Sequence, residues 1–404
     1  MGPPASNAPD ASNGPRPSIA KIGDLAAAAG LRRIHMLSWR DLADVEAGGS
    51  EVHAATVARL WAEAGIEVTL RTSYAQGQAP LVTRDGYRVI RRAGRYLVFP
   101  RAAGSEMVGR HGPRDALVEI WNGMPFFSPV WNRGPSIILL HHVHAEMWKM
   151  VLGDEAPWAA TLGDTIERRI APLVYRRSKI VTLSSSSKDE IVEMLHLPAS
   201  NIHVVPPGID PMFSPGGDRS PTPMVMALGR LVPVKRYDRL IHAVAEARRR
   251  HPELTLTIVG AGYEREYLDQ LVRDLDGTEW VTFAGHVSDP ELVDLYRRAW
   301  LVTSASAREG WGMSLTEAGA CGTPAVATRI PGHIDAVVDG ETGDLVDRDD
   351  EGALGRAIGD LIADDERRAT YGAAALTRSA AYSWEATAAG IMRVLAAEAE
   401  RHRR

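Results

Sequence analysis

The chain has 404 residues, with 46 lysines and arginines against 51 aspartates and glutamates, so its formal charge is −5. Apolar residues at 45% and charged residues at 24% are ordinary for a globular protein and exclude a disordered or collagen-like chain. No basic excess indicates a nucleic-acid partner. A chain of this length predicts two or three domains with well-buried cores.

The thiol content and the apolar pattern bear on the compartment. A single cysteine, Cys321, cannot form an internal disulfide or a thiolate zinc cage, so we expect a cytoplasmic protein. Its place at the end of a short predicted helix favours packing over reactivity. No window approaches 18 uninterrupted apolar residues, so any membrane contact is expected to be peripheral, at the inner membrane face. Five prolines among Gly, Ser, Asn and Ala predict a disordered tail over residues 1–22.

Strand-like and helix-like segments alternate over residues 23–205, which we expect to form the first domain. Strands are predicted at residues 33–38, 66–70, 116–120, 136–140 and 179–183. Gly48 and Gly49 indicate a turn, and Ser50 is the predicted N-cap of a helix that ends at Gly65. The apolar stripe of this helix is Val57, Leu60, Trp61 and Ala64. Alternation of this kind predicts a parallel sheet covered on both faces.

A second alternating run follows a segment rich in proline and glycine, residues 206–222, which predicts an interdomain linker. The second domain is expected over residues 223–383, with strands at 224–228, 254–259, 280–283, 300–303 and 324–328. One of its helices has the apolar stripe Leu292, Leu295, Tyr296 and Ala299. Residues 384–404 predict a final helix, expected to pack back toward the first domain. Two such α/β domains would leave a cleft at the carboxyl ends of both sheets.

The most informative motif is residues 306–328, in which Glu309 and Glu317 are separated by seven residues. Gly310 and Gly312 let the backbone approach a ligand, and Ser314 is expected to open a helix whose N-terminus favours an anion. A purely structural alternative is equally open on these residues. The segment from Ser314 to Glu317 fits a capping box, in which Glu317 only stabilises its own helix.

Two cations follow the first strand of the second domain. Arg230 comes just after the strand, and Lys235 lies five residues later, where the next helix begins. Arginine could hold a diphosphate through two hydrogen bonds, and lysine could act as a point charge. Taken alone, this segment is more typical of a solvated basic loop.

Together these features resemble the retaining glycosyltransferases of family 4, which have the GT-B fold of two Rossmann-like β/α/β domains facing a central cleft. The resemblance extends from about Arg33 to Leu395. It implies that Arg230 and Lys235 hold the diphosphate of a nucleotide-sugar donor. It further implies that Glu309 contacts the donor sugar hydroxyls, that Glu317 binds the ribose hydroxyls, and that the first domain lies on the acceptor side.

The resemblance also assigns backbone contacts. The donor residues implied in this way are Gly48, Gly49, Gly260, His286, Val287, Gly312, Met313, Ser314 and Leu315. Gly48 and Gly49 would meet the donor phosphate and the acceptor, and the segment from Gly285 to Val287 would seat the nucleobase. Because that recognition is largely by backbone groups, the side chains do not choose between UDP, GDP and ADP.

Histidines 141, 142 and 144 and Glu146 follow the strand at 136–140. In an extended chain His142, His144 and Glu146 would share one face and could bind a metal ion. The resemblance instead places a histidine here against the donor sugar. His142 matches that position best and His144 is second, so we expect no metal site.

Arginines in the first domain raise the alternative of contact with an anionic membrane that holds a lipid acceptor. They lie in residues 167–177, at Arg91 and Arg92, and at Arg95. A solvated face is the usual explanation of such a pattern, and Pro172 is expected to interrupt a long helix.

The resemblance therefore implies a metal-independent retaining enzyme that moves a hexose from a UDP- or GDP-sugar to an acceptor hydroxyl of a sugar, lipid or small molecule. No cofactor beyond this co-substrate is expected. His142, Glu309, Arg230 and Lys235 are the predicted catalytic residues. A sugar-nucleotide epimerase, a phosphorylase or a silent nucleotide-sugar binding protein would be alternatives on this fold. A Rossmann oxidoreductase is disfavoured, because Arg265 replaces the third glycine of the dinucleotide fingerprint that begins at Gly260.

Overall fold

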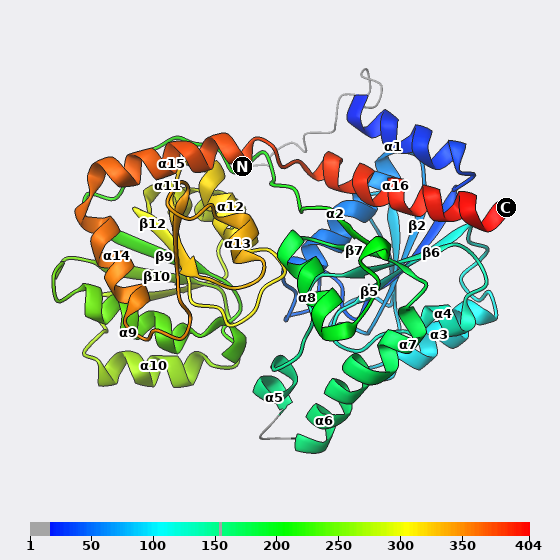
Figure 1. The fold of residues 1–404 in the computed structure, drawn as a ribbon, viewed down its shortest axis with the longest axis horizontal. Helices are drawn as coiled ribbons and strands as arrows, with labels where there is room; N and C mark the ends of the chain where they lie inside the picture. Colours follow the sequence, from blue (N-terminus) through cyan, green and yellow to red (C-terminus); the bar gives the residue numbers. More distant parts are fainter. Residues whose placement is uncertain (1–16, 153–155) are drawn as a thin grey trace, which may run out of the picture.

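The computed structural model describes residues 17–152 and 156–404, and within them the chain forms two α/β domains with one sheet each (Figure 1). The described part of the first domain contains an eight-stranded sheet in the order β3-β4-β2-β1-β5-β6-β7-β8. All neighbouring strands in it are parallel except β3 and β4. Its strands are β1 (Arg33–Leu37), β2 (Glu67–Thr72), β3 (Leu81–Arg84), β4 (Tyr87–Arg91), β5 (Ala116–Trp121), β6 (Ser136–Leu140), β7 (Lys179–Thr182) and β8 (Ile202–Val204).

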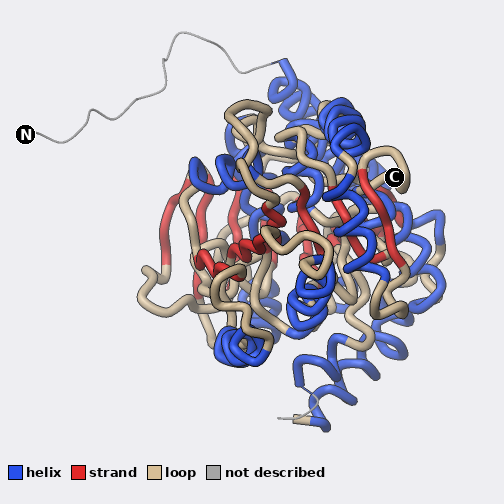
Figure 2. Tube along the Cα trace, turned by 90° about the vertical axis from the view of Figure 1, so that its left-hand side faces the viewer, coloured by secondary structure: helices blue, strands red, loops and turns tan. Residues whose placement is uncertain are grey.

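Helices cover both faces of this sheet. One face packs against α1, α2 and the C-terminal helix α16, and the other against α3, α4, α7 and α8. The helices are α1 (Pro17–Ala28), α2 (Gly49–Glu63), α3 (Val98–Met107), α4 (Ser128–Trp131), α5 (Met147–Leu152), α6 (Pro157–Thr165), α7 (Ala171–Tyr175) and α8 (Ser185–Leu195). A π-helical turn (Ile166–Ile170) joins α6 to α7, and a 3₁₀ turn (Ala199–Asn201) precedes β8. Helices α5 and α6 project from the body of the molecule in both Figure 1 and Figure 2.

The second domain contains, in the described residues, a six-stranded parallel sheet in the order β11-β10-β9-β12-β13-β14. Its strands are β9 (Met224–Leu228), β10 (Thr255–Val259), β11 (Val281–Gly285), β12 (Leu301–Ser304), β13 (Ala325–Thr328) and β14 (Gly343–Val346). Its helices are α9 (Tyr237–Ala247), α10 (Arg265–Asp274), α11 (Asp289–Arg298), α12 (Met313–Ala320), α13 (His333–Ala336), α14 (Ala353–Ala363) and α15 (Asp365–Ser379), with a 3₁₀ turn (Pro233–Lys235) before α9. In both domains the first strand lies inside the sheet, where the strand order reverses and ligands bind in open α/β folds.

The C-terminal helix α16 (Trp384–Arg403) leaves the second domain and packs on the first. Figure 1 shows it lying beside α1. The indole of Trp61 in α2 donates a hydrogen bond to the carbonyl of Ala388, at 3.1 Å. Where the chain returns, it runs against the interdomain linker, and a Cβ on Gly208 would lie 2.1 Å from the backbone nitrogen of Trp384. The two crossings between the domains therefore lie against each other.

Most predicted bounds differ from the structure by one or two residues, and two of the differences have a clear physical reason. The predicted tail over residues 1–22 is wrong from Pro17 onward, because α1 begins there and buries Ile19 and Ile22 against the core; residues 1–16 lie outside the described part. Helix α2 begins at Gly49 rather than after Ser50. Its N-cap is Gly48, whose N–H donates to the carboxylate of Glu51 at 2.8 Å.

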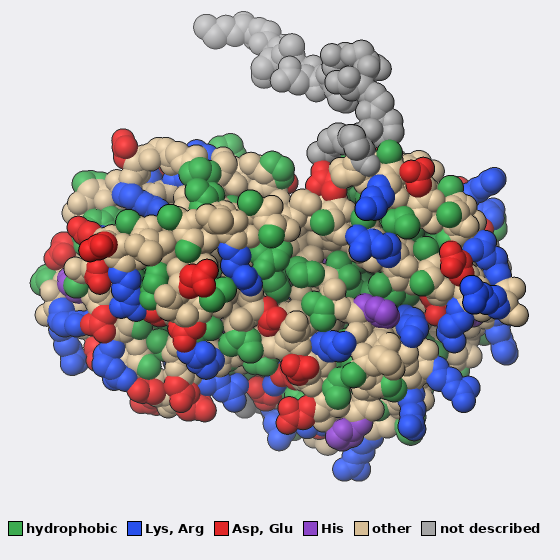
Figure 3. All heavy atoms as spheres, turned by 45° about the horizontal axis from the view of Figure 1, so that its top comes forward, with side chains coloured by type: hydrophobic (Ala, Val, Ile, Leu, Met, Phe, Trp, Pro, Cys, Tyr) green, Lys and Arg blue, Asp and Glu red, His purple; other side chains and the backbone are tan. Residues whose placement is uncertain are grey.

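Three further expectations concern membrane-spanning helices, the single cysteine and the surface charge. Among the described residues, no helix has the length and apolar character needed to cross a bilayer. Cys321 is a free, buried thiol in the hydrophobic core of the second domain, and burial raises its pKa to about 11. Acidic and basic side chains are interspersed over much of the face drawn in Figure 3, in keeping with the small net charge.

The packing of α16 predicts that a substitution near the C-terminus destabilises the first domain. Ile391 is fully buried in the core that includes α1 and α2. Ile391→Ala should lower the free energy of unfolding by about 2–5 kcal/mol, because it leaves a cavity in that core. The exposed Arg393 on the same helix gives the matched control, and Arg393→Ala should stay within about 0.5 kcal/mol of wild type in urea denaturation. Equal stability of the two variants would contradict this packing.

Candidate active site

The loops that follow the first strand of each domain meet across the cleft. The guanidinium of Arg230, just after β9, donates to the carbonyl of Glu46 at 3.3 Å. A Cβ on Gly48 would lie 3.3 Å from Nε of Arg230, and one on Gly49 would lie 3.3 Å from the sulfur of Met313. Both glycines therefore bring the N-terminus of α2 close to the second domain, beside the residues expected to bind the donor.

Lys235 and Glu309 form an ion pair in the cleft. The lysine Nζ lies 2.5 Å from Oε1 of Glu309, and the hydroxyl of Ser306 donates to the same oxygen at 2.8 Å. Burial alone would raise the pKa of Glu309, but Lys235, His333 and the Ser306 hydrogen bond together hold it below its ordinary value. Glu309 is therefore ionised at neutral pH, and the interpretation of this segment as a solvated basic loop is wrong.

Glycines in the next loop support the Arg230 loop from behind. Gly260 has a φ of +126°, and a Cβ there would lie only 2.1 Å from the carbonyl oxygen of Gly229. A Cβ on Gly262 would lie 2.3 Å from the carbonyl oxygen of Leu231. These contacts leave no room for a side chain. In the described arrangement, Gly260 and Gly262 hold the backbone on either side of Arg230.

The start of helix α12 contradicts the capping-box interpretation of Glu317. The helix begins at Met313, and its N-cap is Gly312, which has a φ of +117°. Ser314 lies inside the helix, so the predicted helix start and the capping-box alternative are both wrong. Glu317 instead accepts a hydrogen bond from the hydroxyl of Tyr296 at 2.9 Å. Burial raises its pKa to about 7, against the effect of Tyr296 and with a contribution from Asp210.

His142 faces the cations of the cleft. Its pKa lies well below the ordinary value, because of burial first and then because of His144, Arg308, Lys235 and Arg230. The imidazole is therefore neutral at physiological pH. Its Nε2 is buried and has no hydrogen-bond partner in the described residues, so it is available to a ligand in the cleft.

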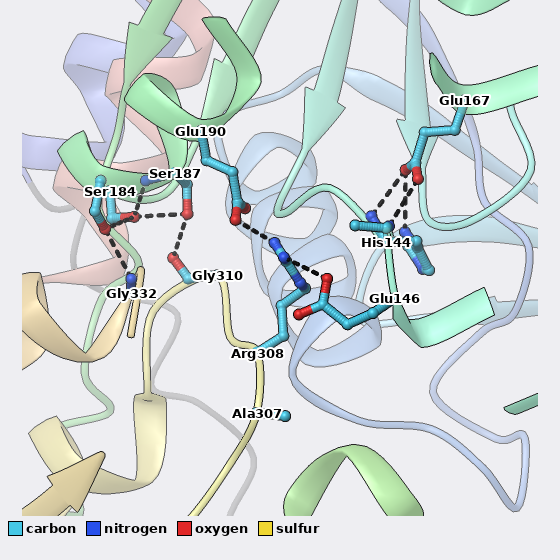
Figure 4. Close-up of polar contacts among 12 residues, drawn as sticks. His144, Glu146, Glu167, Ser184, Ser187, Glu190, Ala307, Arg308, Gly310 and Gly332 are labelled. Carbon is cyan, nitrogen blue, oxygen red and sulfur yellow. Dashed lines mark hydrogen bonds and ion pairs between the residues drawn. The ribbon is translucent and has the colours of Figure 1, made fainter. Parts of the chain in front are cut away.

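His144 is held differently. Its ring stacks on His142 with centroids 4.8 Å apart, and its Nδ1 lies 3.7 Å from the buried carboxylate of Glu167. Glu167 also accepts the backbone N–H groups of His144 and Ala145, at 2.8 and 2.9 Å. These contacts, drawn in Figure 4, fix the loop after β6. His144 supports the position of His142 in this arrangement.

The alternative of a metal site at His142, His144 and Glu146 is not supported by the geometry. Glu146 points to Arg308 of the second domain, with 2.7 Å between the carboxylate and the guanidinium. In the described part of the chain, no three His, Cys, Asp or Glu side chains are grouped so that they could hold a metal ion.

The remaining predicted residues line the same edge of the second sheet. His286 and Val287 follow β11, with His286 exposed and Val287 partly packed on the core. Met313, Ser314 and Leu315 form the first turn of α12, whose amides and dipole favour an anion. This turn lies against Gly49 of the first domain.

Three side chains at this site were not recognised as functional from the sequence. Tyr296 was assigned only to an apolar stripe, yet its hydroxyl binds Glu317. His333 lies beside Gly312, where a Cβ would be 3.1 Å from its ring, and no motif marks it. Arg308 precedes Glu309 directly, and its position next to the motif was a signal that could have been used.

Comparisons with known proteins agree with this geometry. A profile described as Glycosyltransferase Family 4 matches residues 47–213, and one described as Glycosyl transferases group 1 matches residues 211–378. A mannosyltransferase of Mycolicibacterium smegmatis is 32% identical in an alignment of 318 positions that covers 72% of this chain and 79% of that protein. It is named GDP-mannose-dependent alpha-(1-6)-phosphatidylinositol monomannoside mannosyltransferase. The chain belongs to glycosyltransferase family 4.

A second curated relative supports the same conclusion about this glycosyltransferase, and two solved structures share its fold. A D-inositol 3-phosphate glycosyltransferase of Acidothermus cellulolyticus is 30% identical over 86% of this chain and 85% of its own. Sucrose-phosphate synthase from Thermosynechococcus elongatus has a TM-score of 0.76 at 20% identity, covering 88% of this chain and 96% of its own. Anabaena HepE in complex with UDP and glucose has a TM-score of 0.67 at 19% identity, covering 88% and 97%. The predicted GT-B fold is confirmed, and the oxidoreductase alternative is excluded.

The environment of Glu317 predicts a pH effect on the stability of the glycosyltransferase. Its pKa is about 7 in the folded protein against an ordinary 4.5. Between these values the unfolded chain loses the proton while the folded protein keeps it, so Glu317 makes stability fall as the pH rises. The loss is up to about 3 kcal/mol, at about 1.4 kcal/mol per pH unit.

Glu317→Gln removes this titration and keeps an acceptor for Tyr296. Urea denaturation of both proteins at pH 4.5, 6 and 8 measures the effect. The variant should gain stability relative to wild type as the pH rises. A difference that stays constant with pH would contradict the raised pKa.

Proposed function

We propose that this glycosyltransferase transfers a hexose from a GDP- or UDP-sugar to an acceptor hydroxyl, with retention at the anomeric carbon and without a divalent metal ion. The observation that carries the proposal is the ion pair of Lys235 and Glu309, with Arg230 and the neutral His142 close enough to interact with it electrostatically. The relative named for its dependence on GDP-mannose makes that sugar nucleotide the first donor to test.

The proposed chemistry uses each group in one role. The bond between the anomeric carbon and the phosphate oxygen breaks, and Arg230 and Lys235 stabilise the charge that develops on the leaving diphosphate. The acceptor oxygen bonds to the same face of the anomeric carbon, and its proton passes to a phosphate oxygen. Glu309, which is ionised, accepts hydrogen bonds from sugar hydroxyls, and His142 binds the sugar from the opposite domain.

Glu317 is proposed to bind the ribose. Its carboxylate would accept hydrogen bonds from the ribose hydroxyls, and this interaction favours the ionised form. Nucleotide binding should therefore release the proton that Glu317 holds below pH 7. The buried, unpaired thiol of Cys321 is consistent with a reducing compartment, and we propose a cytoplasmic location.

A panel of donors tests the proposal. The protein is incubated without acceptor with GDP-mannose, UDP-glucose or ADP-glucose, and nucleoside diphosphate release is followed with and without EDTA. We expect one donor to be hydrolysed, with equal rates in EDTA. Arg230→Ala and Lys235→Ala should each slow release by about a hundredfold, because each removes charge stabilisation of the leaving group.

Proton NMR of the first-formed sugar reports the stereochemistry. An α-configured hexose from an α-linked donor supports retention, and a β-configured one overturns it. Loss of activity in EDTA that Mg²⁺ restores overturns metal independence. Isomerised donor in place of free sugar would identify an epimerase.

We further propose that the acceptor is presented at an anionic membrane surface. The observation behind this is a row of exposed apolar side chains on the helical run from α6 through the π-helical turn to α7. Its members are Trp158, Leu162, Ile170 and Leu173, exposed by 73, 46, 44 and 79%. Such a patch on a projecting element indicates an interaction surface. The name of the Mycolicibacterium relative includes a phosphatidylinositol, a membrane lipid.

Charge on the same element favours an anionic surface. Arg169, Arg176 and Arg177 are exposed on the same helical run or directly after it, whereas Glu167 is buried. Part of the arginine set predicted for this contact is wrong, because Arg91 is buried against Asp41 at 2.7 Å and Arg95 pairs with Glu46. Pro172 does not interrupt the helical run, which accommodates it through the preceding π-helical turn.

Sedimentation with lipid vesicles tests the membrane contact. Wild type should sediment with vesicles containing phosphatidylglycerol more than with phosphatidylcholine alone, and less so in high salt. The double variant Trp158→Ser, Leu173→Ser should lose this binding. Tyr267→Ser, at an exposed aromatic residue of the second domain, is the matched control and should bind as wild type does. Equal sedimentation of both variants, or self-association through the apolar row, would contradict the proposal.

A further inference from the structure

Arg308 joins the two domains directly beside Glu309. Its side chain is only 8% exposed, and its guanidinium lies between two carboxylates of the first domain (Figure 4). Nη2 is 2.7 Å from Oε2 of Glu146, and Nη1 pairs with Oε1 of Glu190. One arginine therefore links the motif that carries Glu309 to two separate elements across the cleft.

One of those two elements carries a predicted site residue, and the other packs against the loop beyond Glu309. Glu146 lies in the loop after β6, four residues beyond His142, and Glu190 lies in α8. Arg308 is also close enough to His142 to contribute to the lowering of the pKa of its imidazole. Movement of Arg308 would therefore change the position of Glu309 on one side of the cleft and the surroundings of His142 on the other.

The loop beyond Glu309 is docked on the same two elements. The hydroxyl of Ser187 in α8 donates to the carbonyl of Gly310 at 3.2 Å. A Cβ on Gly310 would lie 2.5 Å from the carbonyl oxygen of His141, so the loop backbone touches the end of β6. Asp335 of the second domain adds a second bridge by accepting the N–H groups of Ser185 and Ser186, at 2.9 and 3.2 Å.

Arg308 is needed to balance charge at this contact. Burial raises the pKa of Glu190, and Arg308 acts against that rise. Glu146 has a second partner, Arg348, but at 3.7 Å and on a side chain that is 45% exposed. A buried guanidinium with two carboxylates is held far more firmly than such an exposed pair.

We propose that Arg308 is a positioning residue that places Glu309 opposite His142 only when the two domains are closed. The inference rests on the proposed function, since it concerns the residues expected to hold the donor sugar. Removing Arg308 should shift the protein toward a more open arrangement and misplace Glu309. Binding of a nucleoside diphosphate by the second domain should be retained.

The first measurement follows domain closure and needs no donor. Small-angle X-ray scattering should give a larger radius of gyration for Arg308→Gln than for wild type. Glu190→Gln should shift it in the same direction by less, because the amide oxygen still accepts a hydrogen bond. The matched control is Arg348→Gln, which removes the exposed partner of the same Glu146 and should leave the radius unchanged.

The second measurement separates positioning from folding. With the donor identified in the panel, kcat of Arg308→Gln should fall by about tenfold to a hundredfold, as expected for a misplaced group. The affinity of Arg308→Gln for GDP and UDP should stay within about twofold of wild type. A shift of the protein toward the unfolded state would instead weaken this apparent affinity together with kcat. Arg308→Lys should recover part of kcat, since lysine can pair with one of the carboxylates. The double variant with Glu190→Gln should be no slower than Arg308→Gln alone.

A lower melting temperature of Arg308→Gln with wild-type radius and wild-type kcat would overturn the proposal and assign Arg308 a structural role only. Should Arg308→Gln fail to fold, Arg308→Lys and Glu190→Gln carry the same comparison. If no donor is turned over by wild type, the proposed function fails. The scattering comparison then still decides whether Arg308 holds the domains closed.

Discussion

Charge that is buried between two domains has to be paired, and the rest of this cleft depends on how the pairing is done. Lys235 and Glu309 satisfy each other, and Arg230 uses the carbonyl of Glu46. A bound diphosphate would offer these cations stronger acceptors than they have now. On the proposed function, donor binding would exchange partners inside the site and would free Glu309 to turn from Lys235 to the hydroxyls of a sugar.

The same constraint explains why glycine occurs where the domains touch. A Cβ on Gly310 would lie 2.5 Å from the carbonyl of His141 in the first domain. Within the second domain, a Cβ on Gly332 would lie 2.7 Å from the carbonyl of Glu309 in the same loop cluster. Side chains at these positions would hold the backbones apart and leave the charges between them exposed to water. Close backbone contact reduces the access of water to Glu309, whose side chain is 19% exposed, and this strengthens the electrostatic interactions there.

Strong local periodicity predicted much of the fold, and the elements that it missed or misplaced lack a clear local pattern. The bounds of β6 and β9 were predicted to the residue, because both are short apolar runs between turn signals. Strand β4 was missed because Arg88 and Arg91 break its apolar pattern. These arginines are tolerated there since Thr69 and Asp41, distant in sequence, pair with them. The start of α12 was predicted at Ser314 instead of Met313, because no clear sequence signal marks the left-handed conformation of Gly312.

The motif residues of the second domain were easier to predict than the contacts between the domains, because the partners in those contacts lie far apart in the sequence. Arg230, Lys235, Glu309 and Glu317 could be named as candidates from the sequence because all belong to short motifs of one domain. The partners of Arg308 are 118 and 162 residues away, and no local pattern connects them. The two chain crossings lie against each other at Gly208 and Trp384, so relative movement of the domains has to pivot there. A pivot alone does not select the closed arrangement, and the ionic contacts across the cleft are what favour it.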